Sequence, residues 1–238
     1  MAAASFWEKL LNAIGTAGGA LSSVVEAVRT LFEGDPETRR KVAFSVSVIA
    51  LSAKMAKADG IVTEKEVDAF REIFEFPPDQ AKNVARLYNL ARQDVAGYEA
   101  YAERLAGLCA TCQQECTILE DVLDGLFHIA KADGLIHEAE MAFLERIAEI
   151  FVMSRERFEQ IMARHVSASG RDPYKVLGVS PSDDFPTIRR RYHGLVREHH
   201  PDRLFSSGMP KEFQVIANER MAALNAAYAE IQKARRAA

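Results

Sequence analysis

The chain has 238 residues, a formal net charge of −4 at pH 7 and 48% hydrophobic residues. That length suffices for one large or two small domains, each with its own core. The charge is uneven, with +4 over residues 171–238 and −8 over the rest, so a basic C-terminal module is expected to follow an acidic body. An acidic chain is a poor general binder of nucleic acid, because such binding relies on a basic surface that neutralises phosphates.

Cysteine usage and hydropathy indicate a cytoplasmic protein. The three cysteines, Cys109, Cys112 and Cys116, follow no secretory signal pattern, so a disulfide framework is not expected. No run of about 18 uninterrupted apolar residues is present, which excludes a conventional membrane-spanning helix. The expected location is the cytoplasm, with peripheral attachment to the cytoplasmic face of the inner membrane as the alternative.

Residues 1–34 are expected to form an N-terminal amphipathic helical segment. Apolar side chains recur at helical spacing across residues 5–32, and Gly15, Gly18 and Gly19 predict a kink or two short helices. Such a stripe usually packs against the body of its own protein. The alternative is a helix that contacts a membrane surface or dimerises.

Residues 35–165 are expected to form an all-α bundle. Asp35-Pro36 has the pattern of a helix start, strand patterns are absent, and Phe76-Pro77-Pro78 separates two helical stretches. Within this body, residues 56–66 (AKADGIVTEKE) return 74 positions later as residues 130–140 (AKADGLIHEAE). The repeat predicts a pseudo-symmetric bundle with two similar corners.

In each corner a glycine is expected to end one helix, and Val62 or Ile136 is expected to enter the core. This Ala-Asp-Gly corner, followed by a glutamate in the next helix, resembles the TerB (tellurite-resistance) helical domain over roughly residues 36–165.

The acidic residues of the two corners have two interpretations. Their spacing copies the second half of an EF-hand loop, but Met, Ile and Lys occupy the first and third ligand positions, so a standard calcium site cannot form. One interpretation is a turn followed by a helix cap. The other, which the resemblance to TerB implies, is a single divalent metal ion held between the corners by Asp59, Glu66, Asp133 and Glu140.

Residues 166–171 form a short polar linker, and residues 172–238 carry four elements in order. These are residues 172–179 (DPYKVLGV), a basic amphipathic helix over 187–199, the tripeptide His200-Pro201-Asp202, and residues 224–231 (LNAAYAEI) within a second long helix. Asp184 is placed to cap the first long helix, and the apolar residues of both long helices have matching spacing. An antiparallel hairpin, held by a short first helix, is therefore predicted.

These elements resemble the DnaJ J-domain family along its whole length. A TerB-like domain followed by a C-terminal J-domain is the arrangement of the DjlA-like DnaJ co-chaperones, which the chain resembles as a whole. The resemblance implies that residues 172–238 dock on a DnaK-type heat-shock chaperone and stimulate its ATPase, so the chain itself is not expected to be an enzyme.

The resemblance also assigns roles to individual residues. His200, Pro201 and Asp202 would reach the ATPase-linker junction of the partner, and Asp202 would pair with a partner cation. The outward face of the preceding helix would dock on an acidic surface through Arg189, Arg190, His193 and Arg197. The alternative interpretation of that face is an ordinary solvated helix surface.

Arg191 and Gly194 depart from the family pattern. The family usually has a small residue at the position of Arg191 and often has a basic residue at the position of Gly194. Gly194 weakens the helix and reduces the cationic face. The chain lacks the glycine/phenylalanine-rich and zinc-binding segments of full DnaJ, so the TerB-like body or the N-terminal segment is expected to choose clients or location. An alternative function is an acidic helical scaffold for metal binding or stress response, with an inactive J-like tail.

Overall fold

The computed structural model describes residues 48–55, 64–73, 97–110, 118–165, 170–202 and 214–237. Its labelled helices are α4 (Glu64–Ile73), α6 (Tyr98–Ala110), α7 (Ile118–Ala130), α8 (Glu138–Ile150), α9 (Arg155–His165), α10 (Pro173–Leu177), α11 (Phe185–Glu198) and α13 (Gln214–Ala237). Residues 48–55 are also helical. The chain is all-α, as predicted, and the described ranges contain no strand. The predicted N-terminal segment, residues 1–34, lies outside them.

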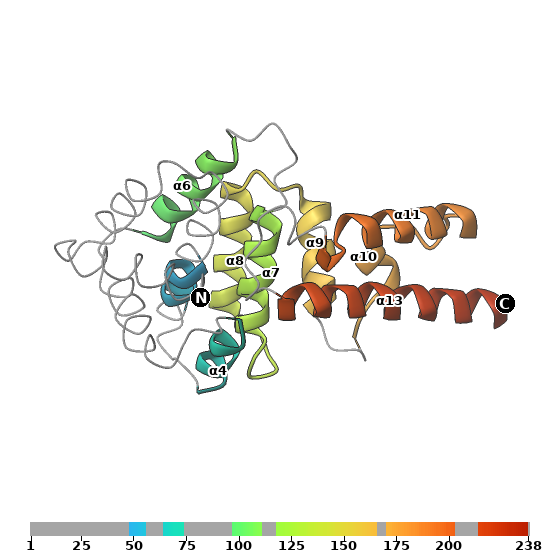
Figure 1. Cartoon of the computed structure of the whole chain (residues 1–238), viewed down its shortest axis with the longest axis horizontal. Helices are drawn as coiled ribbons and strands as arrows, with labels where there is room; N and C mark the ends of the chain where they lie inside the picture. Colours follow the sequence, from blue (N-terminus) through green and yellow to red (C-terminus); the bar gives the residue numbers. More distant parts are fainter. Residues whose placement is uncertain are drawn as a thin grey trace.

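The body is built around α7. A helix that is apolar on most sides has to be enclosed by others, and every residue of α7 from Asp121 to Ala130 is buried. Helices α4, α6, α8 and α9 pack on it, and the buried residues 48–55 join the same core. Figure 1 shows α7 and α8 side by side at the centre, with α6 and α4 at opposite ends of the body. In the parts of the chain described here, no helix has the length and hydropathy that a bilayer crossing requires.

The corner between α7 and α8 has the predicted geometry. Gly134 has a φ of 100°, in the left-handed region that favours glycine. The Leu135 amide donates to Asp133 Oδ1 at 3.1 Å, which closes the turn. Ile136 then packs against the core of the body, which confirms its predicted place. The equivalent corner around Gly60 lies outside the described residues.

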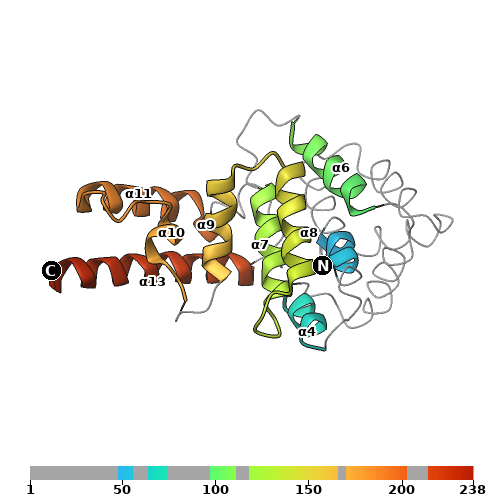
Figure 2. The same cartoon turned by 180° about the vertical axis from the view of Figure 1, so that it is seen from behind.

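Helices α10, α11 and α13 form the C-terminal module, which we call the J-module (residues 172–237). The Asp184 carboxylate accepts the Thr187 amide at 2.9 Å, which confirms the predicted cap of α11. Tyr192 of α11 stacks on Tyr228 of α13 with ring centroids 4.1 Å apart. Helices α11 and α13 form the predicted hairpin, and Figures 1 and 2 both show it projecting away from the body. The buried core of the module consists of Val176, Leu177, Ile188, Leu195, Leu224, Ala227 and Ile231, together with Ala163 of α9.

The body and the J-module share their packing. Ile216, in the first turn of α13, is buried in the core of the body, whereas Ala163 of α9 is buried in the core of the J-module. Helix α10 also packs on α9. The sequence predicts only a short linker between the two modules, and the structure adds a direct interface between them.

The turn between α8 and α9 was not predicted. Val152 has a φ of 54°, a conformation that β-branched residues rarely adopt, and 91% of the residue is exposed. Arg157 donates its amide to Ser154 Oγ at 3.2 Å within the first turn of α9. Neither glycine nor proline marks this turn, so the sequence pattern does not predict a break there.

Candidate functional site

The tripeptide His200-Pro201-Asp202 follows the last turn of α11 and is open to solvent. The side chain of His200 is 51% exposed and that of Asp202 is 91% exposed. The Asp202 amide donates to His200 Nδ1 at 3.3 Å, and this nitrogen lies 3.7 Å from Asp202 Oδ2. These local contacts hold the tripeptide together while the Asp202 carboxylate remains accessible to a cationic group of another molecule.

The four residues predicted to form a cationic face are all exposed on α11. Arg189 Nε lies 3.4 Å from His193 Nε2, one helical turn further along. Arginine side chains gathered on one exposed face create a positive potential that attracts an acidic surface. The structure therefore places the cationic face on α11 and the tripeptide at the C-terminal end of the same helix. The role of both in binding stays a prediction. The residues of the cationic face are Arg189, Arg190, His193 and Arg197.

Arg191 and Gly194, the two departures from the family pattern, have different environments. Arg191 is half-buried, and its Nε donates to the Leu177 carbonyl oxygen at 3.4 Å. It therefore links α11 to the end of α10 and does not belong to the cationic face. Gly194 is exposed, and a β-carbon added to it would meet no atom within 4 Å.

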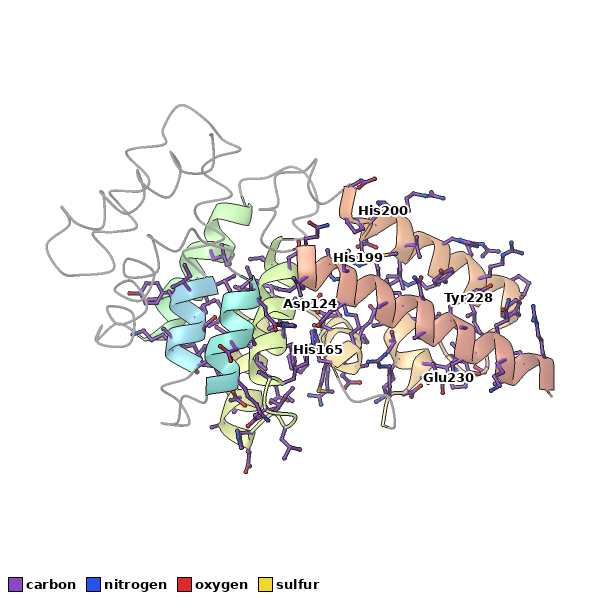
Figure 3. All side chains as sticks on the ribbon, turned by 60° about the horizontal axis from the view of Figure 1, so that its bottom comes forward. Asp124, His165, His199, His200, Tyr228 and Glu230 are labelled. Atoms are coloured by element: carbon purple, nitrogen blue, oxygen red, sulfur yellow. The ribbon has the colours of Figure 1, made fainter. Side chains whose placement is uncertain are left out.

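A cluster of charged side chains is buried where α13 meets α7 and α9. Arg220 of α13 donates from Nε to Asp124 Oδ2 and from Nη2 to Asp121 Oδ1, both at 2.6 Å. Its Nη1 lies 3.0 Å from Nδ1 of His199, at the end of α11. Asp124 Oδ1 accepts a hydrogen bond from His165 Nε2 at 2.8 Å. Figure 3 shows Asp124, His165 and His199 at this junction. We call Asp121, Asp124, Arg164, His165, His199 and Arg220 the junction cluster.

Burial and charge separate the pKa values within the junction cluster. Burial raises the pKa of Asp121 to about 6, although Arg220 opposes the shift. Burial also disfavours the charged form of Asp124, but Arg164 and Arg220 together hold its pKa well below the usual range. Burial, reinforced by the neighbouring guanidinium groups, lowers the pKa of His199 to about 2. His199 is therefore neutral at physiological pH.

Glu219 forms a second ionic contact between α13 and the body. Its Oε2 accepts hydrogen bonds from His128 Nδ1 at 3.0 Å and from Lys131 Nζ at 2.7 Å. The hydrogen bond from His128 is the main cause that lowers the pKa of Glu219 to about 2. Two successive residues of α13 thus make separate contacts with the body. Arg220 binds carboxylates of α7, and Glu219 binds His128 of α7 and Lys131, which directly follows α7.

The junction cluster was not predicted from the sequence. His199 ends the basic amphipathic helix predicted over residues 187–199. It is buried, and both of its ring nitrogens face guanidinium groups. A sequence signal was available, because Arg220 lies four residues after Ile216 and four before Leu224, in the buried register of α13. A charged residue in such a register needs a buried partner of opposite charge.

The described acidic corner uses its carboxylates locally. Glu140 Oε2 accepts the His137 amide at 2.9 Å and so caps the start of α8, while Asp133 closes the preceding turn. Within the ranges that the structure describes, no group of three or more potential ligand residues is arranged to hold a metal ion. Asp59 and the side chain of Glu66 lie outside what is described, so a metal ion shared between the two corners stays a prediction.

Comparisons with known proteins support both halves of this architecture. The family model for tellurite resistance protein TerB matches residues 45–163, and the model for the DnaJ domain matches residues 172–237. The co-chaperone protein DjlA of Photobacterium profundum is 28% identical to the chain, over 82% of the chain and 78% of the relative. DjlA of Haemophilus influenzae is also 28% identical, over 84% and 82%. DjlA of Escherichia coli O157:H7 is 25% identical, over 83% and 81%. No solved structure matches the chain.

The order of the two matched domains is also the order in which the body and the J-module lie along the chain. This chain therefore belongs to the DjlA-like DnaJ co-chaperones, in which a TerB domain precedes a C-terminal DnaJ domain.

Proposed function

We propose that the J-module docks on a DnaK-type heat-shock chaperone and stimulates its ATPase. The observation that carries this proposal is the exposure of His200 and Asp202 at the end of a helix whose outward face is cationic. An acidic surface of the partner would bind the cationic face and thereby bring the tripeptide to a fixed place on the partner. Electrostatic attraction of this kind speeds association and sets orientation.

The tripeptide would act through binding energy. The exposed Asp202 carboxylate offers a partner for a cation of the ATPase, and Pro201 restricts the backbone between Asp202 and His200. Contacts that are stronger in a hydrolysis-competent conformation shift the partner toward that conformation. Hydrolysis by the partner then accelerates, and this chain contributes no catalytic group.

The body would supply the choice of client or location. Residues 1–170 carry a net charge of −8, whereas the J-module is basic, so the two halves suit different partners. The N-terminal segment, residues 5–32, is the second candidate for this role, through membrane contact or dimerisation.

The test is single-turnover ATP hydrolysis by the DnaK-type chaperone, with the unmodified chain and with His200→Gln. The unmodified chain is expected to accelerate hydrolysis, and His200→Gln is expected to return the rate to the basal value. His137→Gln is the matched control, because its side chain is also more than half exposed but lies on the body at the start of α8. Equal losses in both variants, or no stimulation by the unmodified chain, would contradict the proposal and favour the scaffold function.

Gly194→Lys is expected to stabilise α11 and to tighten partner binding. Replacing an exposed helical glycine raises the free energy of unfolding by roughly 0.5–1 kcal/mol. The new cation would lie between Arg190 and Arg197 on the cationic face. Urea denaturation measures the first effect. The concentration for half-maximal stimulation measures the second, and it is expected to fall a few-fold at low salt and less at moderate salt.

Gly107→Lys provides the matched control for this prediction. Gly107 is an exposed glycine within α6, and a β-carbon added there would also meet no atom within 4 Å. Its replacement is expected to give a similar gain in stability with no change in partner binding. A similar change in binding for both variants would mean that the cationic face does not contact the partner.

A further inference from the structure

The last turn of α11 is held by a side chain of the body. Arg157 of α9 donates from Nε and Nη2 to the two carboxylate oxygens of Glu120, at 2.6 and 2.5 Å. The same Nη2 lies 3.3 Å from Glu198 Oε1 and 3.4 Å from His199 Nε2. Glu198 and His199 are the two residues immediately before the tripeptide. A two-pronged guanidinium–carboxylate contact has a defined geometry, so Glu120 sets the direction in which Arg157 reaches α11.

Arg220 holds the same turn from the opposite side. Its contacts to Asp121 and Asp124 anchor it to α7, and its Nη1 lies 3.0 Å from His199 Nδ1. A neutral imidazole has a single acceptor nitrogen. Because the contact to Arg220 is the shorter one, we assign Nδ1 as the acceptor and Nε2 as the protonated nitrogen. With this tautomer Arg157 holds the turn through its hydrogen bond to Glu198, and its guanidinium only lies beside the His199 ring. The orientation of the His199 ring is therefore determined by an arginine that α7 carboxylates hold.

These contacts reach the backbone at the base of the tripeptide. The His199 amide donates to the Leu195 carbonyl oxygen at 2.9 Å and closes the last turn of α11, and His200 follows directly. Burial strengthens the hydrogen bonds of the two arginines, because the Arg220 side chain is 2% exposed and that of Arg157 is 18% exposed. The carboxylates of α7 fix both guanidinium groups, so alternative orientations of this turn would leave buried hydrogen-bonding groups without partners and are disfavoured.

We propose that Arg157 and Arg220 are positioning residues through which the TerB body sets the orientation of the His200-Pro201-Asp202 tripeptide. The three carboxylates of α7 that hold them, Glu120, Asp121 and Asp124, make no contact with the tripeptide themselves and act through the two arginines. The body is thus part of the apparatus that presents the tripeptide. The expected effect on ATPase stimulation rests on the proposed function. The expected effect on the order of the last turn of α11 does not.

The test compares Arg157→Met with Arg155→Met in the full chain. Methionine keeps an unbranched stem of similar length and removes the guanidinium. Arg155 is the matched control, since it lies on the same helix but is 80% exposed and contacts only Glu159 among the pairs described for it. Hydrogen exchange of the His199 amide reports on the last turn of α11 without any partner, and single-turnover hydrolysis reports on stimulation.

Arg157→Met is expected to speed exchange of the His199 amide by about tenfold, as loss of a charge-assisted hydrogen bond implies. The maximal stimulation is expected to fall several-fold, while the concentration for half-maximal stimulation stays nearly constant because the cationic face is intact. Arg155→Met is expected to change neither quantity. Unchanged exchange in Arg157→Met would overturn the proposal, and so would a change in the half-maximal concentration with an unchanged maximum.

Glu120→Gln extends the test to a residue of α7 whose carboxylate binds Arg157. It is expected to speed exchange of the His199 amide as well, and the double variant with Arg157→Met is expected to be no worse than Arg157→Met alone. Additive effects would overturn the proposed chain of contacts. If the unmodified chain does not stimulate the ATPase, the proposed function fails, and the exchange measurements alone decide whether the body positions the tripeptide.

Discussion

Asp124→Ala is expected to lower the free energy of unfolding by about 3–5 kcal/mol, the usual loss when one partner of a buried ion pair is removed. The carboxylate binds Arg220, Arg164 and His165 at once, and its side chain is 1% exposed. Its removal leaves these three groups without their common partner in a place that water does not reach. Urea denaturation followed by circular dichroism measures the loss.

The shape of the unfolding curve provides a second readout. The unmodified chain is expected to unfold in one transition, because α13 contributes to both cores. Asp124→Ala is expected to separate an early transition of the J-module from a later one of the body. Asp133→Ala is the control, since this carboxylate accepts one amide at an exposed turn, and its loss is expected to cost about 1 kcal/mol. Equal losses in both variants would show that the junction cluster makes no special contribution.

Acidification from pH 7 to pH 5 is expected to destabilise the unmodified chain by about 2 kcal/mol relative to His199→Gln. Burial, together with the facing Arg220, Arg164 and Arg157, lowers the pKa of His199 to about 2 in the folded chain. In the unfolded chain the imidazole titrates near its ordinary value of 6.5. Below that pH the unfolded state binds one more proton than the folded state, so stability falls as the pH falls.

The comparison with His199→Gln is needed because the raised pKa of Asp121 changes the pH dependence of stability in the opposite direction. Its pKa is raised from 3.8 to about 6, so the folded state binds the extra proton between these values and gains stability as the pH falls. Both chains carry Asp121, and the difference between their urea midpoints isolates the imidazole, since glutamine can still accept from Arg220. Parallel stability curves for the two chains would contradict a buried neutral His199. An imidazole NMR signal of His199 that titrates above pH 6 would do so as well.

Several elements were predictable because their determinants are close together in the sequence. The cap of α11 depends on Asp184 and an amide three residues later, and the turn after α7 depends on Gly134. The exposure of the cationic face followed from the periodicity of α11, which places Ile188 and Leu195 in the core, whereas the role of the tripeptide was inferred from the family resemblance. Caps, turns and periodicity act within one or two helical turns, and the chain records them directly.

Other features depend on how helices pack, which local pattern does not determine. Arg220 binds Asp121, 99 residues earlier, and the register of α13 shows that Arg220 is buried without showing which carboxylate it meets. The left-handed turn at Val152 has no glycine to mark it. The sequence by itself therefore determined the all-α fold, the hairpin and the cationic face. Only the tertiary structure decided that the body and the J-module share their cores and hold the base of the tripeptide together, because a buried charge selects its partner only when the helices are packed.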